Sequence, residues 1–329
     1  MKLFILNAKE VGKALPMSAA VEAMKAAFAQ LSAGSAQFPL RSRLEVDAHE
    51  GVTLIMPAYL SESEDLAVKV VSVFPQNAAI SEPTIYAAVL ALDPTTGRPT
   101  ALMEGGALTA IRTGAASGAA TDILARTDSK TVGLFGSGVQ ARTQLEAVCT
   151  VRQIQEVFIY SLDHTGALKF VDDMAGKGPI PDQLTIVEHS AAAVINADII
   201  CTATTSQTPV FSSTDLQPGT HINAVGAFTP QMQEIGSDTV QKARVFVDAY
   251  EAALDEAGDL IIPLDEGIIS KDHIIGELGE VILGKKTGRT SDKDITLFKS
   301  VGVAVQDAIA AARALEGAVM QGLGTEVDF

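Results

Sequence analysis

Apolar positions follow two different patterns along this chain. From residue 130, short runs rich in Val, Ile and Phe alternate with segments whose apolar residues recur at helical spacing. Strands that alternate with helices are typical of an α/β fold with a parallel, doubly wound sheet. Strands are expected at 131–135, 156–161, 184–189, 198–204, 220–226 and 243–249, and helices at 139–151, 165–176 and 190–197.

The first third of the chain has a different pattern. A short apolar strand at 3–6 precedes a helix with apolar residues on one face from Met17 to Phe28. An Ala- and Gly-rich helix is expected at 108–126, and a last helix with a continuous apolar face at 294–315. Strands of a second sheet are predicted by apolar, β-branched runs at 53–60, 66–75 and 84–93, with a Pro- and Gly-containing turn at 93–100.

Composition narrows the possible partners. Apolar residues make up 47% and aromatic residues 5% of the chain, without Trp, which suits a parallel sheet buried under helices. The net charge of −16 argues against nucleic acid or an anionic membrane surface as a partner. The two cysteines, Cys149 and Cys201, lie in apolar surroundings and are expected to be buried free thiols. The sequence shows neither a signal-peptide core nor a membrane span, so a cytoplasmic location is expected.

The stretch TVGLFGSGVQAR, residues 131–142, predicts a dinucleotide-binding turn. It follows a predicted strand and opens a predicted helix, as the GxGxxG/A fingerprint requires. Gly136 permits the tight turn, Gly138 leaves space for a pyrophosphate, and Ala141 lets helix and strand pack closely. The free N–H groups of the helix then face the anion. The alternative is a plain strand-to-helix turn in another α/β sheet.

The cofactor's ribose is expected near the end of the next strand. An acidic residue about 20 positions after the turn is usual in NAD sites, and that distance leads to Ser161, which is uncharged. Asp163 lies two residues further and could reach the ribose, whereas His164 could meet a 2′-phosphate. The loop contains no Arg, so NAD is favoured and NADP stays open.

Four segments, in order and over nearly the whole chain, resemble the ornithine cyclodeaminase/mu-crystallin family. The stretch LTAIRTGAAS before the glycine turn is specific to that pattern. The segments are ALMEGGALTAIRTGAASGAATDILAR, VGLFGSGVQARTQLEAV, HINAVGAFTPQMQEI and LFKSVGVAVQD. The resemblance implies a Rossmann domain at 113–299 and an α+β domain, formed by 1–112 plus 300–329, for substrate binding and homodimer formation. It also implies an α-amino or α-imino acid as substrate.

Basic residues are informative in so acidic a chain. Lys69 lies within the apolar run LAVKVVSVF, where a charge must be paired or functional. By resemblance, Lys69 faces the substrate, Arg112 lies at the domain junction, and Arg43, with Arg41 as its alternate, binds the substrate carboxylate. Arginine suits a carboxylate because it can donate two parallel hydrogen bonds. Lys69 and Arg112 are therefore the catalytic candidates.

Further positions are expected to contact ligands, mostly by resemblance. Thr84 is expected at the substrate. The five histidines are scattered without ligand spacing, so no metal site is predicted. The expected cofactor-binding residues are Thr113, Gly136, Ser137, Gly138, Val139, Gln140, Ala141, Ser161, Asp163, Asn223, Val225, Gly226 and Ser300.

Two departures from the family pattern favour one branch of it. Cyclodeaminases of the family carry acidic residues where this chain has Leu54 and Phe228, and neither side chain can do acid–base work. Glu234 and Asp238 are nearby acids, each expected as a helix-start charge. We therefore expect an NAD(P)H-dependent reductase of α-imino acids, with Δ1-pyrroline-2-carboxylate as the best single substrate. Alanine dehydrogenase, ornithine cyclodeaminase and a mu-crystallin-like nucleotide-binding protein are the alternatives.

Overall fold

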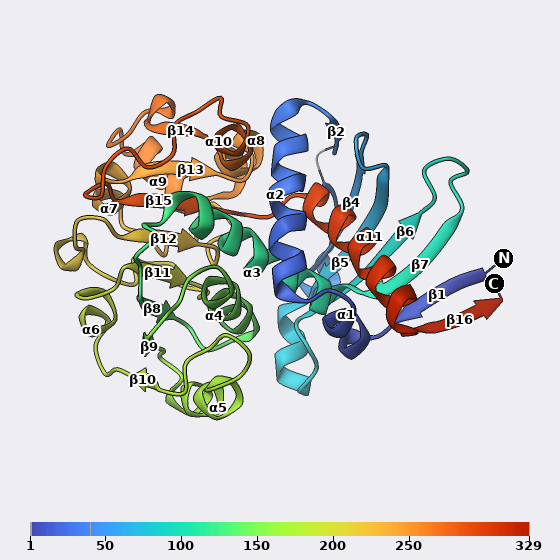
Figure 1. Cartoon of the computed structure of the whole chain (residues 1–329), viewed down its shortest axis with the longest axis horizontal. Coiled ribbons are helices and arrows are strands. Elements are labelled where there is room, and N and C mark those ends of the chain that lie inside the picture. The colour runs from blue at the N-terminus through green and yellow to red at the C-terminus, as the bar shows by residue number, and fades with distance from the viewer. Residues whose placement is uncertain (1, 40, 329) are drawn as a thin grey trace. The chain divides into compact units, whose positions relative to one another are not determined.

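The computed structural model describes residues 2–39 and 41–328. By its internal contacts the chain forms two compact units. We call Met1–Arg112 with Val303–Phe329 the terminal unit, and Thr113–Gly302 the central unit. Helix α3 (Gly105–Leu124) runs through the boundary between them. Figure 1 labels the elements of both units.

The terminal unit is a sheet with helices on one face. Its strand order is β16-β1-β7-β6-β5-β4-β2, with β3 paired to β4. Helix α11 packs across β4, β5 and β6 and against α1 and α2 (Figure 1). The strands are β1 (Lys2–Leu6), β2 (Ala36–Gln37), β3 (Ser42–Val46), β4 (Gly51–Leu60), β5 (Asp65–Val73), β6 (Ile85–Leu92), β7 (Pro99–Glu104) and β16 (Thr325–Asp328); the helices are α1 (Ala8–Ala14), α2 (Met17–Ala33) and α11 (Ala304–Gln321).

The strands of the terminal unit alternate between a covered and an uncovered face. Met56, Lys69 and Val89 are direct neighbours across β4, β5 and β6, and all three are buried. Their chain neighbours point the other way, and Ile55 and Val70 are exposed there. Lys69 is thus a charged residue on the core face of its sheet.

The central unit is a parallel sheet with strand order β10-β9-β8-β11-β12-β15-β13-β14. Every one of its strand pairs is parallel, so the predicted doubly wound α/β fold is confirmed. The strands are β8 (Thr131–Phe135), β9 (Glu156–Tyr160), β10 (Leu184–Ile186), β11 (Ile199–Thr202), β12 (His221–Ala224), β13 (Arg244–Val247), β14 (Ile274–Glu277) and β15 (Thr296–Lys299); the helices are α4 (Val139–Val151), α5 (His164–Met174), α6 (Ser190–Val194), α7 (Ser237–Lys242), α8 (Tyr250–Glu256), α9 (Gly258–Asp265) and α10 (Leu278–Ile282).

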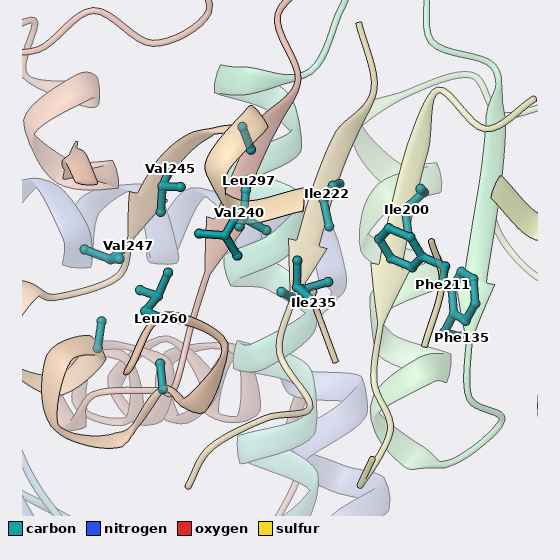
Figure 2. Close-up of a cluster of buried hydrophobic side chains, with 14 of the residues drawn as sticks. Phe135, Ile200, Phe211, Ile222, Ile235, Val240, Val245, Val247, Leu260 and Leu297 are labelled. Carbon is teal, nitrogen blue, oxygen red and sulfur yellow. The ribbon is translucent and has the colours of Figure 1, made fainter. Parts of the chain in front are cut away.

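A row of aliphatic side chains runs through the core of the central unit (Figure 2). Ile200, Ile222, Leu297 and Val245 are register partners on β11, β12, β15 and β13, and each is fully buried. Burying such a side chain stabilises the fold by roughly 1.5–3 kcal/mol. Strands buried on both faces explain why the sequence shows continuous apolar runs here rather than alternation.

The single helix expected at 294–315 is wrong. Residues Thr296–Lys299 form β15, between β12 and β13, and α11 begins only at Ala304. Leu297 and Phe298 are fully buried in the sheet, and Gly302 adopts a left-handed φ of 83°, which interrupts any helix. Because β15 and α11 follow one another and both are rich in apolar residues, their sequence has the pattern of one long helix.

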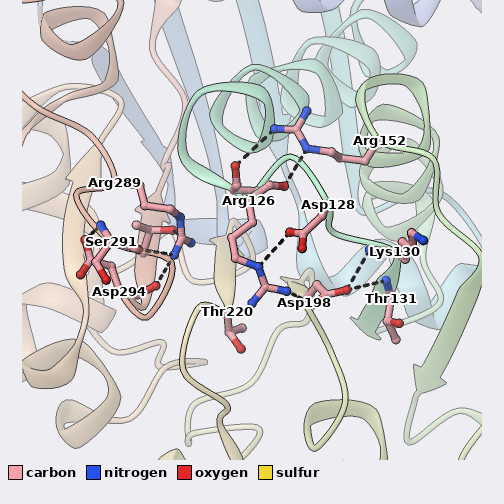
Figure 3. A network of polar contacts seen from close by, with 12 residues as sticks. Arg126, Asp128, Lys130, Thr131, Arg152, Asp198, Thr220, Arg289, Ser291 and Asp294 are labelled. Atoms are coloured by element: carbon pink, nitrogen blue, oxygen red, sulfur yellow. Dashed lines mark hydrogen bonds and ion pairs between the residues drawn. The ribbon is translucent and has the colours of Figure 1, made fainter.

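A network of hydrogen bonds and ion pairs connects residues at the amino-terminal edge of the central sheet (Figure 3). Asp198, just before β11, accepts hydrogen bonds from the backbone N–H groups of Lys130 and Thr131 at 2.8 and 3.1 Å, and pairs with Arg126. Arg152 Nε donates to the Arg126 carbonyl at 3.1 Å. This edge is opposite the carboxyl ends of the strands, where ligands bind in such sheets. The network is therefore structural.

Two further expectations concern the cysteines and membranes. Cys149 and Cys201 are buried free thiols, as predicted, and burial raises the pKa of each to about 12, which keeps them unreactive. Among residues 2–39 and 41–328, we find no helix with the length and apolar character needed to cross a bilayer.

Candidate active site

Lys69 lies in the middle of β5 and points beneath α11. Its side chain is 3% exposed, and its Nζ lies 2.6 Å from Oδ2 of Asp307 on α11. Asp307 is itself 1% exposed. The charge found in the apolar run is therefore paired inside the unit, as burial demands.

Arg112 joins the same carboxylate from α3. Its Nε donates to Asp307 Oδ1 at 3.0 Å, and its Nη1 donates to Gln306 Oε1 at 3.0 Å. Gln306 Oε1 also accepts from the Val303 N–H at 2.8 Å. Gln306 Nε2 is buried and has no hydrogen-bond partner among the described residues. It is a spare donor beside two cations.

Asp307 and Gln306 were missed from the sequence. The signal was present, because a polar pair interrupts the Ala- and Val-rich helix AVQDAIAAA. A carboxylate on the buried face of an apolar helix calls for a partner in the same way as Lys69 does.

Electrostatics make the Lys69 cluster, defined as Lys69, Arg112 and Asp307, receptive to an anion. Burial lowers the pKa of Lys69 to about 8; Asp307 opposes this, while Arg112 and Arg41 add to it. Burial alone would raise the pKa of Asp307, but Lys69 and Arg112 outweigh it and hold the pKa below its usual value. Two cations share one carboxylate, so an added carboxylate would balance the charge.

The other predicted substrate residues lie differently. The ladder places Arg43 on the same sheet face as Lys69, but its side chain is 62% exposed and pairs with Glu45. The charge of Arg41, the alternate, is close enough to lower the pKa of Lys69. Thr84 is exposed, and its carbonyl accepts from the Phe74 N–H at 2.8 Å. The structure thus brings Lys69 and Arg112 together, without Arg43 or Thr84.

The glycine turn in the central unit fits a dinucleotide. Gly136 has a φ of 101°, and a Cβ there would stand 2.6 Å from the Ala203 carbonyl oxygen. Gly138 precedes α4 without a side-chain cap, and a Cβ there would meet nothing within 4 Å. Open space thus lies before the uncapped N–H groups of a 13-residue helix, with Val139 exposed at its start. A pyrophosphate suits this position, while Gln140 is half-buried and Ala141 fully buried behind it.

Three of the predicted cofactor-binding residues, Ser137, Ser161 and Asp163, are linked by hydrogen bonds near the end of β9. Ser137 and Ser161 hydrogen-bond through their hydroxyl groups at 3.0 Å. Asp163 caps α5, with Oδ1 accepting from the Gly166 N–H at 2.9 Å. Thr113 is buried, and its carbonyl accepts from Gln144 Nε2 at 3.2 Å.

Two of the predicted cofactor-binding residues, Asn223 and Ser300, form side-chain hydrogen bonds within the central unit. Asn223 is fully buried, with Nδ2 donating to Thr121 Oγ1 at 2.9 Å and Oδ1 3.2 Å from His221 Nε2. Ser300 is 2% exposed and donates to Asp248 Oδ2 at 2.7 Å. These side chains bond within the unit because they lie at buried strand ends. Val225 is buried beside them.

Glu234 is a fully buried acceptor, which corrects its assignment as a helix-start charge. Its Oε1 accepts from the Thr204 N–H and Oγ1 at 2.6 and 2.8 Å. Its Oε2 accepts from Thr202 Oγ1 at 2.8 Å and from the Gly226 N–H at 2.7 Å. It thereby ties the loops after β11 and β12. Asp238, in contrast, does lie in the first turn of α7, as predicted.

A second buried ion pair lies behind Glu234. Lys299 Nζ, at the end of β15, is 2.9 Å from Asp259 Oδ2, and neither side chain is exposed. Burial and the Asp259 charge raise the pKa of Glu234, and Lys299 opposes them. Among residues 2–39 and 41–328, no group of three or more His, Cys, Asp or Glu side chains could hold a metal ion.

Comparison with known proteins places this geometry in a family. The model of the ornithine cyclodeaminase/mu-crystallin family matches residues 1–321. The chain belongs to this family. The family predicted from the sequence is thus confirmed.

Within the family, the chain is similar to named enzymes along its whole length. It is 42% identical over 328 residues to a Δ1-pyrroline-2-carboxylate reductase of Bacillus cereus, covering 99% of this chain and 100% of the relative. A solved structure of Thermococcus litoralis Δ1-pyrroline-2-carboxylate reductase in complex with NADH and L-proline is 46% identical, with a TM-score of 0.93, covering 98% and 100% of the two chains. An archaeal alanine dehydrogenase dimer with bound NAD is 35% identical, with a TM-score of 0.91 and complete coverage of both chains.

Leu54 and Phe228 stand at the two positions where, by resemblance, cyclodeaminases of the family carry acidic residues. Leu54 lies on β4 and is half-buried, and Phe228 is 44% exposed after β12. Neither can carry a proton. The nearby Glu234 is occupied by four hydrogen bonds.

Proposed function

We propose that this chain is an NAD(P)H-dependent reductase of α-imino acids that converts Δ1-pyrroline-2-carboxylate to L-proline. The observation that carries the proposal is the Lys69 cluster, in which two buried cations share the single carboxylate of Asp307. A substrate with one carboxylate and one imine nitrogen complements that charge. The names of the Bacillus cereus and Thermococcus litoralis relatives support the same substrate and product.

The residues of the terminal unit are proposed to bind and protonate the imino acid. Arg112, helped by Arg41 or Arg43, holds the carboxylate through charge-assisted hydrogen bonds. Gln306 Nε2 is a further donor for it. Reduction adds a hydride to the imine carbon and a proton to the nitrogen, and Lys69 supplies that proton as an ammonium group. Asp307 keeps Lys69 oriented, at 2.6 Å, while the lysine gives up and regains its proton.

The residues of the central unit are proposed to hold the nicotinamide dinucleotide. The uncapped start of α4 at Gly138 binds the pyrophosphate, and Ser161 and Asp163 lie where the ribose of the adenosine is expected. When bound, the cofactor supplies the hydride. The reaction then requires the imine carbon to be held against the nicotinamide ring, and such positioning accounts for much of the rate gain of a hydride transfer.

The remaining enzymes of the family are poorer matches. Cyclisation of ornithine with loss of ammonia needs acid–base groups beyond hydride transfer, and Leu54 and Phe228 cannot supply them. Alanine dehydrogenase would need ammonia as a second substrate. A binding protein without turnover has no need for a buried lysine whose pKa lies near 8.

The test is a cofactor-oxidation assay at 340 nm with purified protein and Δ1-pyrroline-2-carboxylate. Parallel reactions contain pyruvate with ammonia, and ornithine with NAD. We expect rapid oxidation of the reduced cofactor with the cyclic imine alone, and L-proline as the product. Oxidation that needs pyruvate and ammonia would assign alanine dehydrogenase, and proline formation from ornithine would assign the cyclodeaminase. Cofactor binding without any turnover would leave a nucleotide-binding protein.

We also propose that the chain forms a homodimer through the uncovered face of the terminal sheet. Ile5, Ile55, Val70, Tyr86 and Leu102 are all exposed, and their register pairs lie on one side of that sheet. An apolar surface of this kind marks an interaction site. Sedimentation velocity should give a dimer, and Val70→Asp should give a monomer. A monomeric parent protein would refute the proposal. A cytoplasmic location remains a prediction.

A further inference from the structure

The strand order of the central sheet singles out one point on its carboxyl edge. After β8 the chain adds β9 and β10 on one side, and then returns to add β11 and β12 on the other (Figure 1). The direction of winding therefore reverses between β8 and β11. Ligands of such sheets bind at this reversal, outside the carboxyl ends of the strands. The glycine turn follows β8, so the loops after β11 and β12 lie on the other side of the reversal.

The loop after β11 packs directly against the glycine turn. The Ala203 N–H donates to the Phe135 carbonyl at 3.0 Å. A Cβ on Gly136 would stand 2.6 Å from the Ala203 carbonyl oxygen and 3.5 Å from Cγ2 of Thr204. Residues 203 and 204 thus form one side of the space beside the turn. A shift of this loop would change the shape of that space.

The loop after β12 packs against the same segment, and Glu234 joins the two loops. A Cβ on Gly226 would stand 2.3 Å from the Thr204 carbonyl oxygen and 2.4 Å from Oε1 of Glu234. A glycine is needed where a backbone carbonyl comes so close. Glu234 Oε1 accepts from the Thr204 N–H at 2.6 Å, and Oε2 accepts from the Gly226 N–H at 2.7 Å. The carboxylate therefore sets the spacing of the two loops.

The backbone of Glu234 is fixed by its own hydrogen bonds. Its N–H donates to Asp259 Oδ1 at 2.7 Å, and its carbonyl accepts from the Val210 N–H at 2.9 Å. Asp259 in turn pairs with Lys299 at the end of β15. The Glu234 carboxylate is fully buried, so its place is determined by the sheet and not by solvent.

We propose that Glu234 is a positioning residue for the nicotinamide half of the dinucleotide. The glycine turn binds the pyrophosphate, and the adenosine half extends toward the end of β9. The nicotinamide half then extends across the reversal, over the loops that Glu234 fixes. The inference rests on the proposed function for the binding of a nicotinamide dinucleotide. It gives a role in that binding to a buried carboxylate that acts through the backbone of Thr204 and Gly226.

The variant Glu234→Gln tests this role with little change in volume. The hydroxyl groups of Thr202 and Thr204 can rotate and accept from the new amide, whereas backbone N–H groups can only donate. The N–H groups of Thr204 and Gly226 donate to different carboxylate oxygens. One of them therefore loses its acceptor whichever way the amide turns. Because an unpaired donor away from water is unfavourable, the loop that carries it should shift.

The experiment measures the binding of NADH and of ADP-ribose to the full-length protein by titration calorimetry. ADP-ribose keeps the adenosine, the pyrophosphate and the second ribose, and lacks only the nicotinamide. We expect Glu234→Gln to raise the Kd of NADH about tenfold or more, and that of ADP-ribose less than about threefold. A purely structural role would not separate the two ligands.

Two further variants complete the design. Thr204→Val keeps the shape of the side chain and removes one hydroxyl donor to Glu234 Oε1, so it should give the same selective loss at about threefold. Asp198→Asn is the matched control, because this carboxylate accepts from the N–H groups of Lys130 and Thr131 at the opposite edge of the sheet. It should leave both affinities unchanged. Thermal unfolding shows which variants keep the fold, and Thr204→Val carries the test if Glu234→Gln does not fold.

The outcomes separate this inference from the proposed function. Equal losses for NADH and ADP-ribose, or an unchanged affinity for NADH in both loop variants, would overturn the inference and leave the reductase proposal intact. A selective loss for NADH in a protein that reduces no imino acid would support the inference and refute the reductase. A parent protein that binds neither ligand would refute both.

Discussion

Each of the two units contains one fully buried Lys–Asp pair, and the two pairs differ in what surrounds them. Lys69 and Asp307 are 2.6 Å apart in the terminal unit, and Lys299 and Asp259 are 2.9 Å apart in the central unit. In burial and in the distance between the charged groups, the two pairs are nearly equivalent. The residues around each pair give the two clusters net charges of opposite sign.

The pair in the terminal unit has a surplus of positive charge. Arg112 adds a second cation to the carboxylate of Asp307, and Gln306 contributes a buried N–H donor with no partner among the described residues. Such a cluster is incomplete, because buried charge is costly unless it is compensated. A bound carboxylate would complete it.

The pair in the central unit has a surplus of negative charge that the fold itself satisfies. Glu234 adds a second carboxylate and accepts four hydrogen bonds. Asp259 Oδ1 accepts from the N–H groups of Glu234 and Ile235 at 2.7 and 2.9 Å. This cluster fastens loops at the carboxyl edge of the sheet. A buried lysine therefore indicates a substrate site only where charge and donors remain unmatched.

The largest expected effect comes from Lys69→Met. Loss of the proton donor should lower kcat/KM for the imino acid about a thousandfold, within the usual range for an acid–base group. Binding of NADH should stay the same, because the glycine turn belongs to the central unit. Steady-state kinetics and cofactor titration measure the two effects. Activity within threefold of the parent would show that the Lys69 cluster is as structural as the Lys299 pair.

Lys299→Met should instead act on stability. It leaves Asp259 and Glu234 buried without a cation, which costs about 3–5 kcal/mol in the free energy of unfolding. Urea unfolding should show the loss, and the double variant Lys299→Met/Asp259→Asn should recover part of it. An unchanged unfolding midpoint, or a loss of kcat in protein that is still folded, would contradict the scaffold role.

The sequence allowed much of one cluster to be predicted and little of the other. Lys69 stood out because a charge interrupts a strand-like apolar run. Lys299 did not, because β15 and α11 follow one another and together imitate a single amphipathic helix. The same error hid Asp307, whose burial depends on the packing of α11 over β5. Fold class follows from local patterns, whereas pairing between distant segments requires the tertiary structure.

The predicted dinucleotide site also shows which features can be predicted from sequence and which cannot. Its residues are contiguous, so roles for Gly136 and Gly138 in dinucleotide binding could be predicted from spacing alone. For Asn223 and Ser300 the sequence does not give the direction of the side chain, because whether a polar side chain at a strand end faces outward depends on its neighbours. Here Thr121 and Asp248 bind them inside the unit.

A smaller effect distinguishes Arg41, which precedes β3, from Arg43, which lies within β3. Arg41 influences the pKa of Lys69, whereas Arg43 is 62% exposed and pairs with Glu45. Arg41→Ala should therefore raise KM for the imino acid by about tenfold or more, the usual worth of a hydrogen bond to a charged group. Arg43→Ala is the matched control and should change KM less than threefold. The reverse order would assign the carboxylate to Arg43.

Without any substitution, we expect the rate to depend on pH through the ionisation of Lys69. With its pKa lowered to about 8, the lysine is mostly protonated at neutral pH and loses its proton as the pH rises through 8. Because imine reduction needs the ammonium form, kcat/KM should be level below pH 8 and fall about tenfold per pH unit above it. Oxidation of L-proline needs the neutral amine, so its rate should rise through the same pH.

The variant Lys69→Arg shows whether the fall in rate above pH 8 comes from ionisation of Lys69 or of the substrate. Arginine keeps its charge throughout the accessible range, so the residual activity of this variant should lack the limb near pH 8. A limb that persists at the same pH would belong to the imine. The surplus positive charge of the Lys69 cluster would then serve only to bind the carboxylate, and the proton would have to reach the nitrogen from solvent.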